Sequence, residues 1–83
     1  MKTKLEAYKN YLLGIKRSLV YYNYLRPLFD YLEINKIDFY KMTKDEMAKY
    51  FTDKNYKPNA INNVIKSCRD FCRYENVTEH CCF

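Results

Sequence analysis

The sequence predicts an all-α protein that folds as a compact four-helix bundle. Apolar residues recur at intervals of three and four along most of the chain, which is the spacing of amphipathic helices. The 83 residues include one Gly and two Pro, so few positions favour the tight turns of β-hairpins. Hydrophobic residues make up 48% of the chain and aromatic residues 18%, which is enough for the packed core of one small domain.

The first two helices are predicted at residues 3–13 and 19–34. Gly14, the only glycine of the chain, is expected to end the first helix, because glycine adopts the left-handed backbone conformation at low cost. Ser18 is the expected N-cap of the second helix, and Pro27 is expected to kink that helix or to break its hydrogen bonding. The positions expected in the core are Leu5, Tyr8, Leu12 and Ile15 in the first helix, and Leu19, Tyr21, Tyr22, Leu25, Leu28, Phe29 and Leu32 in the second.

A connector at residues 35–42 separates these helices from the third and contributes Ile37 and Phe39 to the core. Thr43 and Glu46 have the spacing of a capping box, in which each side chain accepts a hydrogen bond from the backbone N–H of the other residue. The helix that they start is expected to end near Thr52. Its predicted core residues are Met47, Tyr50 and Phe51.

The last helix is predicted to begin at Pro58 and to continue to about Glu75. Proline suits the first position of a helix, because the N–H that it lacks has no partner inside the helix. The apolar face of this helix consists of Ile61, Val64, Ile65, Cys68, Phe71 and Cys72.

A second face of the same helix carries amide and cationic side chains, and we refer to it as the polar face. Asn pairs bidentately with adenine, and Lys and Arg bind guanine or phosphate. Asp70 is the only acidic residue between Asp53 and Glu75, whereas an ordinary solvated face mixes acids with bases. The polar face therefore favours a nucleic-acid contact, and its members are Asn59, Asn62, Asn63, Lys66, Arg69 and Arg73.

The net charge of +5 is unevenly distributed, because both ends of the chain are basic and residues 30–46 are acidic. A basic face attracts nucleic acid, acidic proteins and membrane surfaces alike, so charge alone does not choose among them. No apolar segment approaches the roughly 18 residues of a membrane span, and the N-terminus does not have the pattern of a signal peptide. We expect a cytoplasmic protein, nucleoid-associated or viral, without a membrane partner.

Three segments, in this order and at these separations, resemble the N-terminal core-binding domain of phage integrases and other tyrosine recombinases. They are residues 21–32 (YYNYLRPLFDYL), residues 42–47 (MTKDEM) with Tyr50, and residues 56–74 (YKPNAINNVIKSCRDFCRY). In the last segment, the types typical of the family stand at Ile61, Asn62, Ser67, Arg69, Asp70, Phe71 and Tyr74. The resemblance covers about residues 5–77.

The resemblance implies a SAM-like four-helix bundle at residues 1–77, which forms half of a clamp around the duplex at the core recombination site. Residues 78–83 would be a tail or the start of a linker to a separate catalytic domain. In this family the second and fourth helices face the major groove. The DNA-binding residues implied are Lys16, Arg17, Ser18 and Tyr22 near the start of the second helix, and Lys57, Asn59, Asn62, Asn63, Lys66 and Arg69 in and before the fourth.

The chain is not expected to be an enzyme by itself. The family's chemistry needs a tyrosine nucleophile, two arginines, a lysine and histidines on a larger domain, whereas this chain has one histidine, His80. We therefore interpret it as a fragment of a longer integrase, with a free-standing relic or antagonist as the alternative. The expected partners are double-stranded DNA and the parent's catalytic domain, with a monomer alone and a tetramer on DNA for the full-length parent.

Two other interpretations compete with DNA binding. A zinc site can be drawn from Cys68, Cys72, His80, Cys81 and Cys82. However, Cys68 and Cys72 lie on the apolar face, where cysteine behaves as a small hydrophobe, so no metal and no other cofactor is expected. The alternative function is a small helical protein-interaction module whose docking surface is formed by some of the ten tyrosines.

Overall fold

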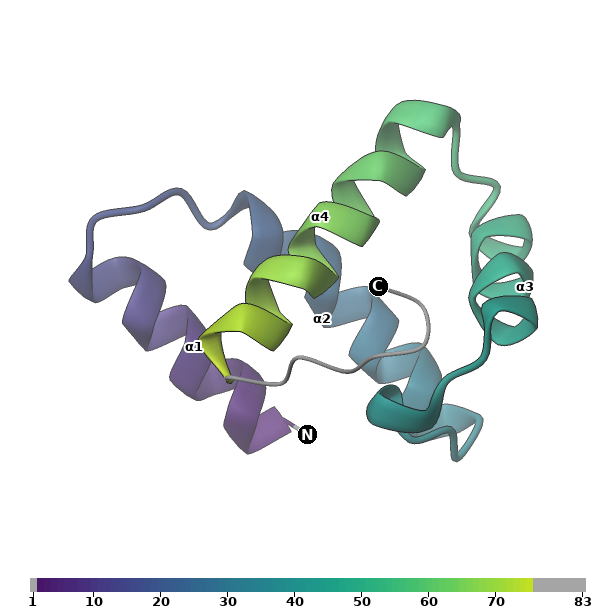
Figure 1. The fold of residues 1–83 in the computed structure, drawn as a ribbon, viewed down its shortest axis with the longest axis horizontal. Coiled ribbons are helices and arrows are strands. Elements are labelled where there is room, and N and C mark those ends of the chain that lie inside the picture. The colour runs from purple at the N-terminus through teal and green to yellow at the C-terminus, as the bar shows by residue number, and fades with distance from the viewer. Residues whose placement is uncertain (1, 76–83) are drawn as a thin grey trace.

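The computed structural model describes residues 2–75, which form four α-helices and one short 3₁₀ helix and contain no strand (Figure 1). The predicted all-α, four-helix fold is therefore confirmed. The elements are α1 (Lys2–Gly14), α2 (Val20–Ile34), η1 (Phe39–Lys41), α3 (Lys44–Lys54) and α4 (Pro58–Tyr74).

The two longest helices, α2 and α4, form the centre of the bundle. α4 crosses α2 and packs against it more extensively than any other pair of helices does, and α1 packs against α2 as well. In Figure 1, α1 and α3 lie on opposite sides of this central pair. Consequently one face of α4 is committed to the core, and the opposite face is left to solvent. None of the helices within residues 2–75 has the length and apolarity needed to cross a membrane.

Four aromatic rings from different elements meet in the middle of the core. The ring of Phe71 lies edge-on to those of Tyr8, Phe29 and Phe39, with centroids 5.3, 5.3 and 5.7 Å apart. Edge-to-face packing brings the positive ring edge against the negative face of the neighbour, and it adds to the gain from burying the rings. Phe71 therefore joins α4 to α1, α2 and η1 in a single cluster.

The predicted helix starts at Thr43 and Pro58 are confirmed. The Thr43 hydroxyl oxygen accepts a hydrogen bond from the Glu46 backbone N–H at 3.2 Å, and the Glu46 carboxylate accepts one from the Thr43 N–H at 2.9 Å. Pro58 occupies the first turn of α4. α3 runs to Lys54, two residues beyond its expected end, and Asn55 in the left-handed conformation (φ 55°) closes it.

The junction between α1 and α2 differs from the prediction in three ways. Gly14 is the last residue of α1 and not the residue after it, and Lys16, with φ 58°, takes the left-handed conformation that was expected at the glycine. Ile15 was expected in the core but is 46% exposed, because the chain leaves the helix before its side chain can turn inward. Ser18 precedes the N-cap residue, Leu19, although its Oγ accepts a hydrogen bond from the Val20 N–H at 3.2 Å.

Pro27 does not end α2, which continues through it from Val20 to Ile34. Proline has no backbone N–H, so the carbonyl of Asn23 lacks the hydrogen bond that residue 27 would otherwise donate. The expected core positions around the proline are occupied as predicted, with Leu25, Leu28 and Phe29 all buried. Packing of the apolar face of α2 against α4 thus outweighs the local cost of the proline.

Most of the remaining core predictions are confirmed. Ile37, Phe51, Ile61 and Ile65 are only partly buried, as are Leu19, Tyr21 and Tyr22. The fully buried or nearly buried residues include Leu5, Tyr8, Leu12, Leu32, Phe39, Met47, Tyr50, Val64, Cys68, Phe71 and Cys72.

Candidate nucleic-acid interface

α4 separates its two faces cleanly. Val64, Cys68 and Phe71 are fully buried, whereas Asn62 and Lys66 on the polar face are exposed. This separation follows from the sequence, since the polar residues recur with the helical period but are displaced by one position from the apolar ones. The exposed members of the polar face are Asn59, Asn62, Lys66, Arg69 and Arg73.

Asn63 is the member of the polar face that the structure turns partly inward. Its side-chain Nδ2 donates to the Tyr24 hydroxyl of α2 at 3.3 Å, and its backbone carbonyl accepts a hydrogen bond from Ser67 Oγ at 2.6 Å. Asn63 therefore lies at the edge of the α2–α4 contact, where part of its hydrogen-bonding capacity is already used.

The four residues predicted before and at the start of α2 are not equivalent. Lys16 and Ser18 are exposed in the turn. Tyr22 is half-buried, and the ammonium of Lys9 lies 5.4 Å from the centre of its ring. Arg17 is the one that reaches α4, where its Nη1 lies 3.4 Å from Asp70 Oδ1.

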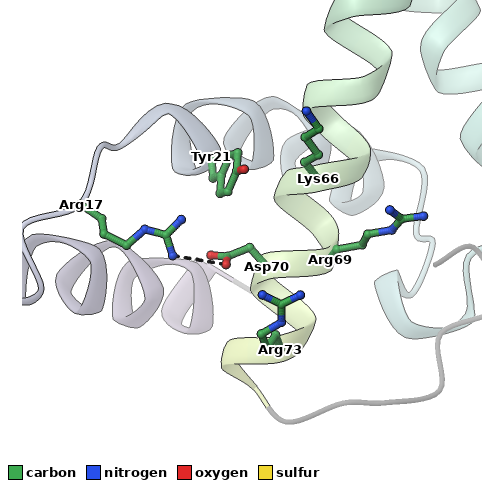
Figure 2. A pocket seen from close by; sticks show the side chains of 6 residues that line it. All are labelled: Arg17, Tyr21, Lys66, Arg69, Asp70 and Arg73. Atoms are coloured by element: carbon green, nitrogen blue, oxygen red, sulfur yellow. Dashed lines mark hydrogen bonds and ion pairs between the residues drawn. The ribbon is translucent and has the colours of Figure 1, made fainter.

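The structure brings three predicted residues, Arg17, Lys66 and Arg69, together around one open hollow of about 290 Å³. Figure 2 shows Arg17 reaching across from the turn before α2, while the other charged side chains rise from α4. The guanidinium of Arg69 points away from Arg17, so Arg69 forms the rim. We refer to this site as the cationic hollow, and its lining residues are Arg17, Tyr21, Lys66, Arg69, Asp70 and Arg73.

The electrostatics of the cationic hollow favour an anion. Four cationic side chains line the hollow together with one carboxylate, and this carboxylate is already engaged. Asp70 accepts hydrogen bonds from the Tyr8 hydroxyl as well as from Arg17. Burial, and then this hydrogen bond to Asp70, raise the pKa of Tyr8, so the hydroxyl remains protonated as a donor. The hollow therefore keeps an excess of positive charge that is open to solvent and can attract an anion.

Three lining residues of the hollow were not among the predicted DNA-binding residues. Arg73 belongs to the polar face, and continuing the helical spacing by one more turn beyond Arg69 would have included it. Asp70 stood out in the sequence only as the single acid on a basic segment. Nothing in the sequence indicated Tyr21, which enters the site because Arg17 packs over its ring, with Cζ 5.8 Å from the ring centre.

The predicted residues at the start of α4 lie away from the hollow. Lys57 is the N-cap residue of the helix, and Asn59 and Asn62 are exposed in its first turns. Asn59 and Arg69 are ten residues apart, which is about 15 Å along a helix at 1.5 Å per residue. The candidate interface is therefore elongated, with amide groups toward one end of α4 and cations toward the other.

The two described cysteines belong to the core. Cys68 is 0% and Cys72 is 6% exposed. Within residues 2–75, no three His, Cys, Asp or Glu residues are grouped as a metal site would require. The other members of the conceivable zinc site, His80, Cys81 and Cys82, lie outside the described residues.

Cys72 is expected to make stability fall as the pH rises in the alkaline range. Burial, and then the Glu75 carboxylate, raise the pKa of its thiol from 9.0 to about 11. Between these values the unfolded chain has released a proton that the folded protein still binds, so the free energy of unfolding should decrease by up to about 1.4 kcal/mol per pH unit. Urea unfolding across this interval measures the slope.

The alanine variant of Cys72 isolates this contribution. Burial also raises the pKa values of Tyr8 and Tyr40, so these side chains add their own slope above about pH 10. Cys72→Ala keeps the tyrosine contribution and removes that of the thiol, so its stability should fall less steeply than that of the wild type. Parallel curves for the two proteins would contradict the assignment.

Comparison of the chain with protein-family models, with curated proteins and with solved structures gave no match in any of the three. The likeness to recombinase core-binding domains accordingly stays a prediction from the sequence.

Proposed function

We propose that this chain is the DNA-binding domain of a site-specific tyrosine recombinase, non-catalytic by itself, which clamps the duplex at the core recombination site. The observation that carries the proposal is the composition of the exposed face of α4. Along this face, amides are followed by cations with no carboxylate except Asp70, and the Asp70 carboxylate is occupied by Tyr8 and Arg17.

The length of the polar face suits a groove. A helix of 17 residues is about 25 Å long, and the major groove of B-DNA, about 12 Å wide, admits one α-helix. In the proposed arrangement Asn59 and Asn62 read base edges, while Lys66, Arg69 and Arg17 contact phosphates on the flanking backbone. Phosphate contacts of this kind fix the register of the protein, and the amides supply sequence preference.

The parent protein would supply what this domain lacks. A separate catalytic domain would complete the clamp from the other side of the duplex, and a tetramer of the parent would assemble on DNA. The isolated domain is therefore expected to bind DNA weakly, because it offers half of the contacts.

Binding to a random duplex at two or more salt concentrations tests the proposal. The logarithm of the affinity should fall linearly with the logarithm of salt concentration, with a slope of about −2 to −4 if two to four phosphates are neutralised. Fluorescence anisotropy with a labelled duplex measures both the affinity and the slope. A domain with no measurable affinity at low salt, or with a slope near zero, would contradict the proposal.

One observation favours the second candidate, a protein-interaction module. The exposed rings of Tyr11 and Tyr74 lie 4.8 Å apart, and Leu13, Ile15 and Val20, which lie between the last turn of α1 and the start of α2, are each about half exposed. An apolar interface of this kind would be insensitive to salt, since it releases no counterions. The salt titration therefore separates the two functions.

A further inference from the structure

Asp70 links the core to the surface. Its carboxylate accepts a hydrogen bond from the hydroxyl of Tyr8, a residue of α1 that is 0% exposed. Its other oxygen, Oδ1, faces Arg17 Nη1 at 3.4 Å. The Asp70 side chain is itself only 14% exposed, so the buried tyrosine anchors it firmly.

Arg17 is held by two contacts but keeps most of its donors. Its Cζ lies 5.8 Å from the centre of the Tyr21 ring, and one of its amino groups is directed at Asp70. A guanidinium carries five N–H donors in a fixed plane, so several stay available at the hollow, and the side chain is 47% exposed. The contacts restrain a long, flexible side chain, and this lowers the entropy that a ligand must remove.

We propose that the cationic hollow binds one phosphate group, and that Asp70 is a positioning residue that holds Arg17 in place for it. The hollow has room for such a group, since its volume of about 290 Å³ is roughly ten times the 30 Å³ share of a water molecule. Arg73 and Lys66 also line the hollow, and Figure 2 shows their side chains rising from the same helix as Asp70. Phosphate, like carboxylate, is an anion that planar guanidinium groups bind bidentately.

The inference deepens the proposed function and rests on it in one respect, because a phosphodiester of duplex DNA is the occupant that function implies. A free phosphate-bearing ligand presents the same chemistry. Titration with inorganic phosphate and titration with duplex DNA distinguish the two sources.

The role assigned to Asp70 can be distinguished from simple charge compensation by the sign of one effect. If Asp70 only neutralised part of the positive charge of the hollow, then Asp70→Asn, which removes a negative charge, would tighten phosphate binding. If Asp70 positions Arg17, the same change weakens binding, because Arg17 loses its ionic partner and becomes free to rotate.

The measurement is a titration of the folded chain with inorganic phosphate, followed by NMR at backbone amides and at the Arg17 guanidinium. Saturable shifts are expected around Arg17, Lys66 and Arg73. Asp70→Asn should weaken the affinity on the order of threefold to tenfold, which is the factor that one well-placed hydrogen bond contributes. Melting curves establish that each variant is folded.

Two further variants support the interpretation. Tyr8→Phe leaves the net charge unchanged and removes the hydroxyl that anchors Asp70, so it should weaken phosphate binding in the same direction. Asp30→Asn is the matched charge control, since Asp30 is an exposed residue of α2, nine residues and about 14 Å along the helix from Tyr21. It should leave the affinity for phosphate within a factor of about two, because charges farther apart than a Debye length are screened.

Equal or tighter phosphate binding by Asp70→Asn would overturn the positioning role, and the lack of saturable shifts around the hollow would overturn the site. The same titrations with duplex DNA separate this inference from the proposed function. If phosphate saturates the hollow while duplex affinity shows no salt dependence, the proposed DNA-binding function is excluded. The hollow is then a binding site for a free phosphate-bearing ligand. If duplex binding depends on salt but Arg17→Gln and Arg73→Gln leave it unchanged, the cationic hollow is excluded as the phosphate site. The proposed DNA-binding function is then retained.

Discussion

Replacement of Phe71 by alanine is expected to cost about 3–5 kcal/mol of unfolding free energy, the range for large aromatic residues in protein cores. Phe71 is fully buried, and its ring packs edge-on against Tyr8, Phe29 and Phe39. The variant loses the transfer energy of the ring and leaves a cavity shared by three helical segments, which cannot all close in on it. A domain of this size has about 4–12 kcal/mol of stability in total. The replacement should therefore remove at least about a quarter of this stability, and about the whole of it at the low end of the range.

Circular dichroism during thermal and urea unfolding measures this effect. Ile34→Ala is the matched control, because Ile34 is also a large apolar residue of a helix but is 80% exposed. Its replacement should change stability by less than about 0.5 kcal/mol. If the two variants lost similar stability, Phe71 would not be the centre of the core.

Joint replacement of Asn62, Lys66 and Arg69 by alanine is expected to lower duplex affinity by at least about 100-fold at low salt, since single base or phosphate contacts contribute about 1–3 kcal/mol each. The salt slope should become less steep by about two units, one for each cation removed. Stability should be nearly unchanged, because all three side chains are exposed and alanine is a strong helix former.

The matched control removes two cations elsewhere. Lys41 and Lys49 are exposed on η1 and α3, which do not line the cationic hollow. Their joint replacement by alanine should reduce affinity by less than about tenfold through the weaker long-range field. Equal losses in the two variants would mean that only net charge matters, and unchanged affinity in the triple variant would exclude the polar face from the interface.

Much of the fold could be predicted because several signals agreed in each helix. At Thr43 the capping box, the apolar spacing and the acidic first turn all indicated one helix start, and the structure has it there. At the α1–α2 junction each helix boundary depended on a single residue, Gly14 as the end of the first helix and Ser18 as the N-cap of the second. No apolar spacing between them supported either boundary. α1 includes Gly14 as its last residue, and Lys16 adopts the left-handed conformation instead.

The site could be predicted in part, because helical periodicity shows which residues of one helix share a face. It placed Lys66 and Arg69 together on α4. It could not show that Arg17 would cross to Asp70, since that contact spans 53 positions and depends on how α1 and α2 pack. It also gave no sign that Asn63 would turn toward Tyr24, because the boundary between two helix faces is set by the partner helix and not by the period alone.

The contact between Tyr8 and the end of α4 has a consequence for folding during synthesis. The ring and hydroxyl of Tyr8 meet Phe71, Asp70 and Tyr74, about 62 positions later in the chain. During synthesis α2 can cover part of the apolar side of α1 early, but the part that contacts α4 stays uncovered until nearly the whole domain has left the ribosome. Native closure of the domain therefore has to follow the synthesis of α4, and a chain stalled before α4 would display an incompletely covered hydrophobic surface to chaperones.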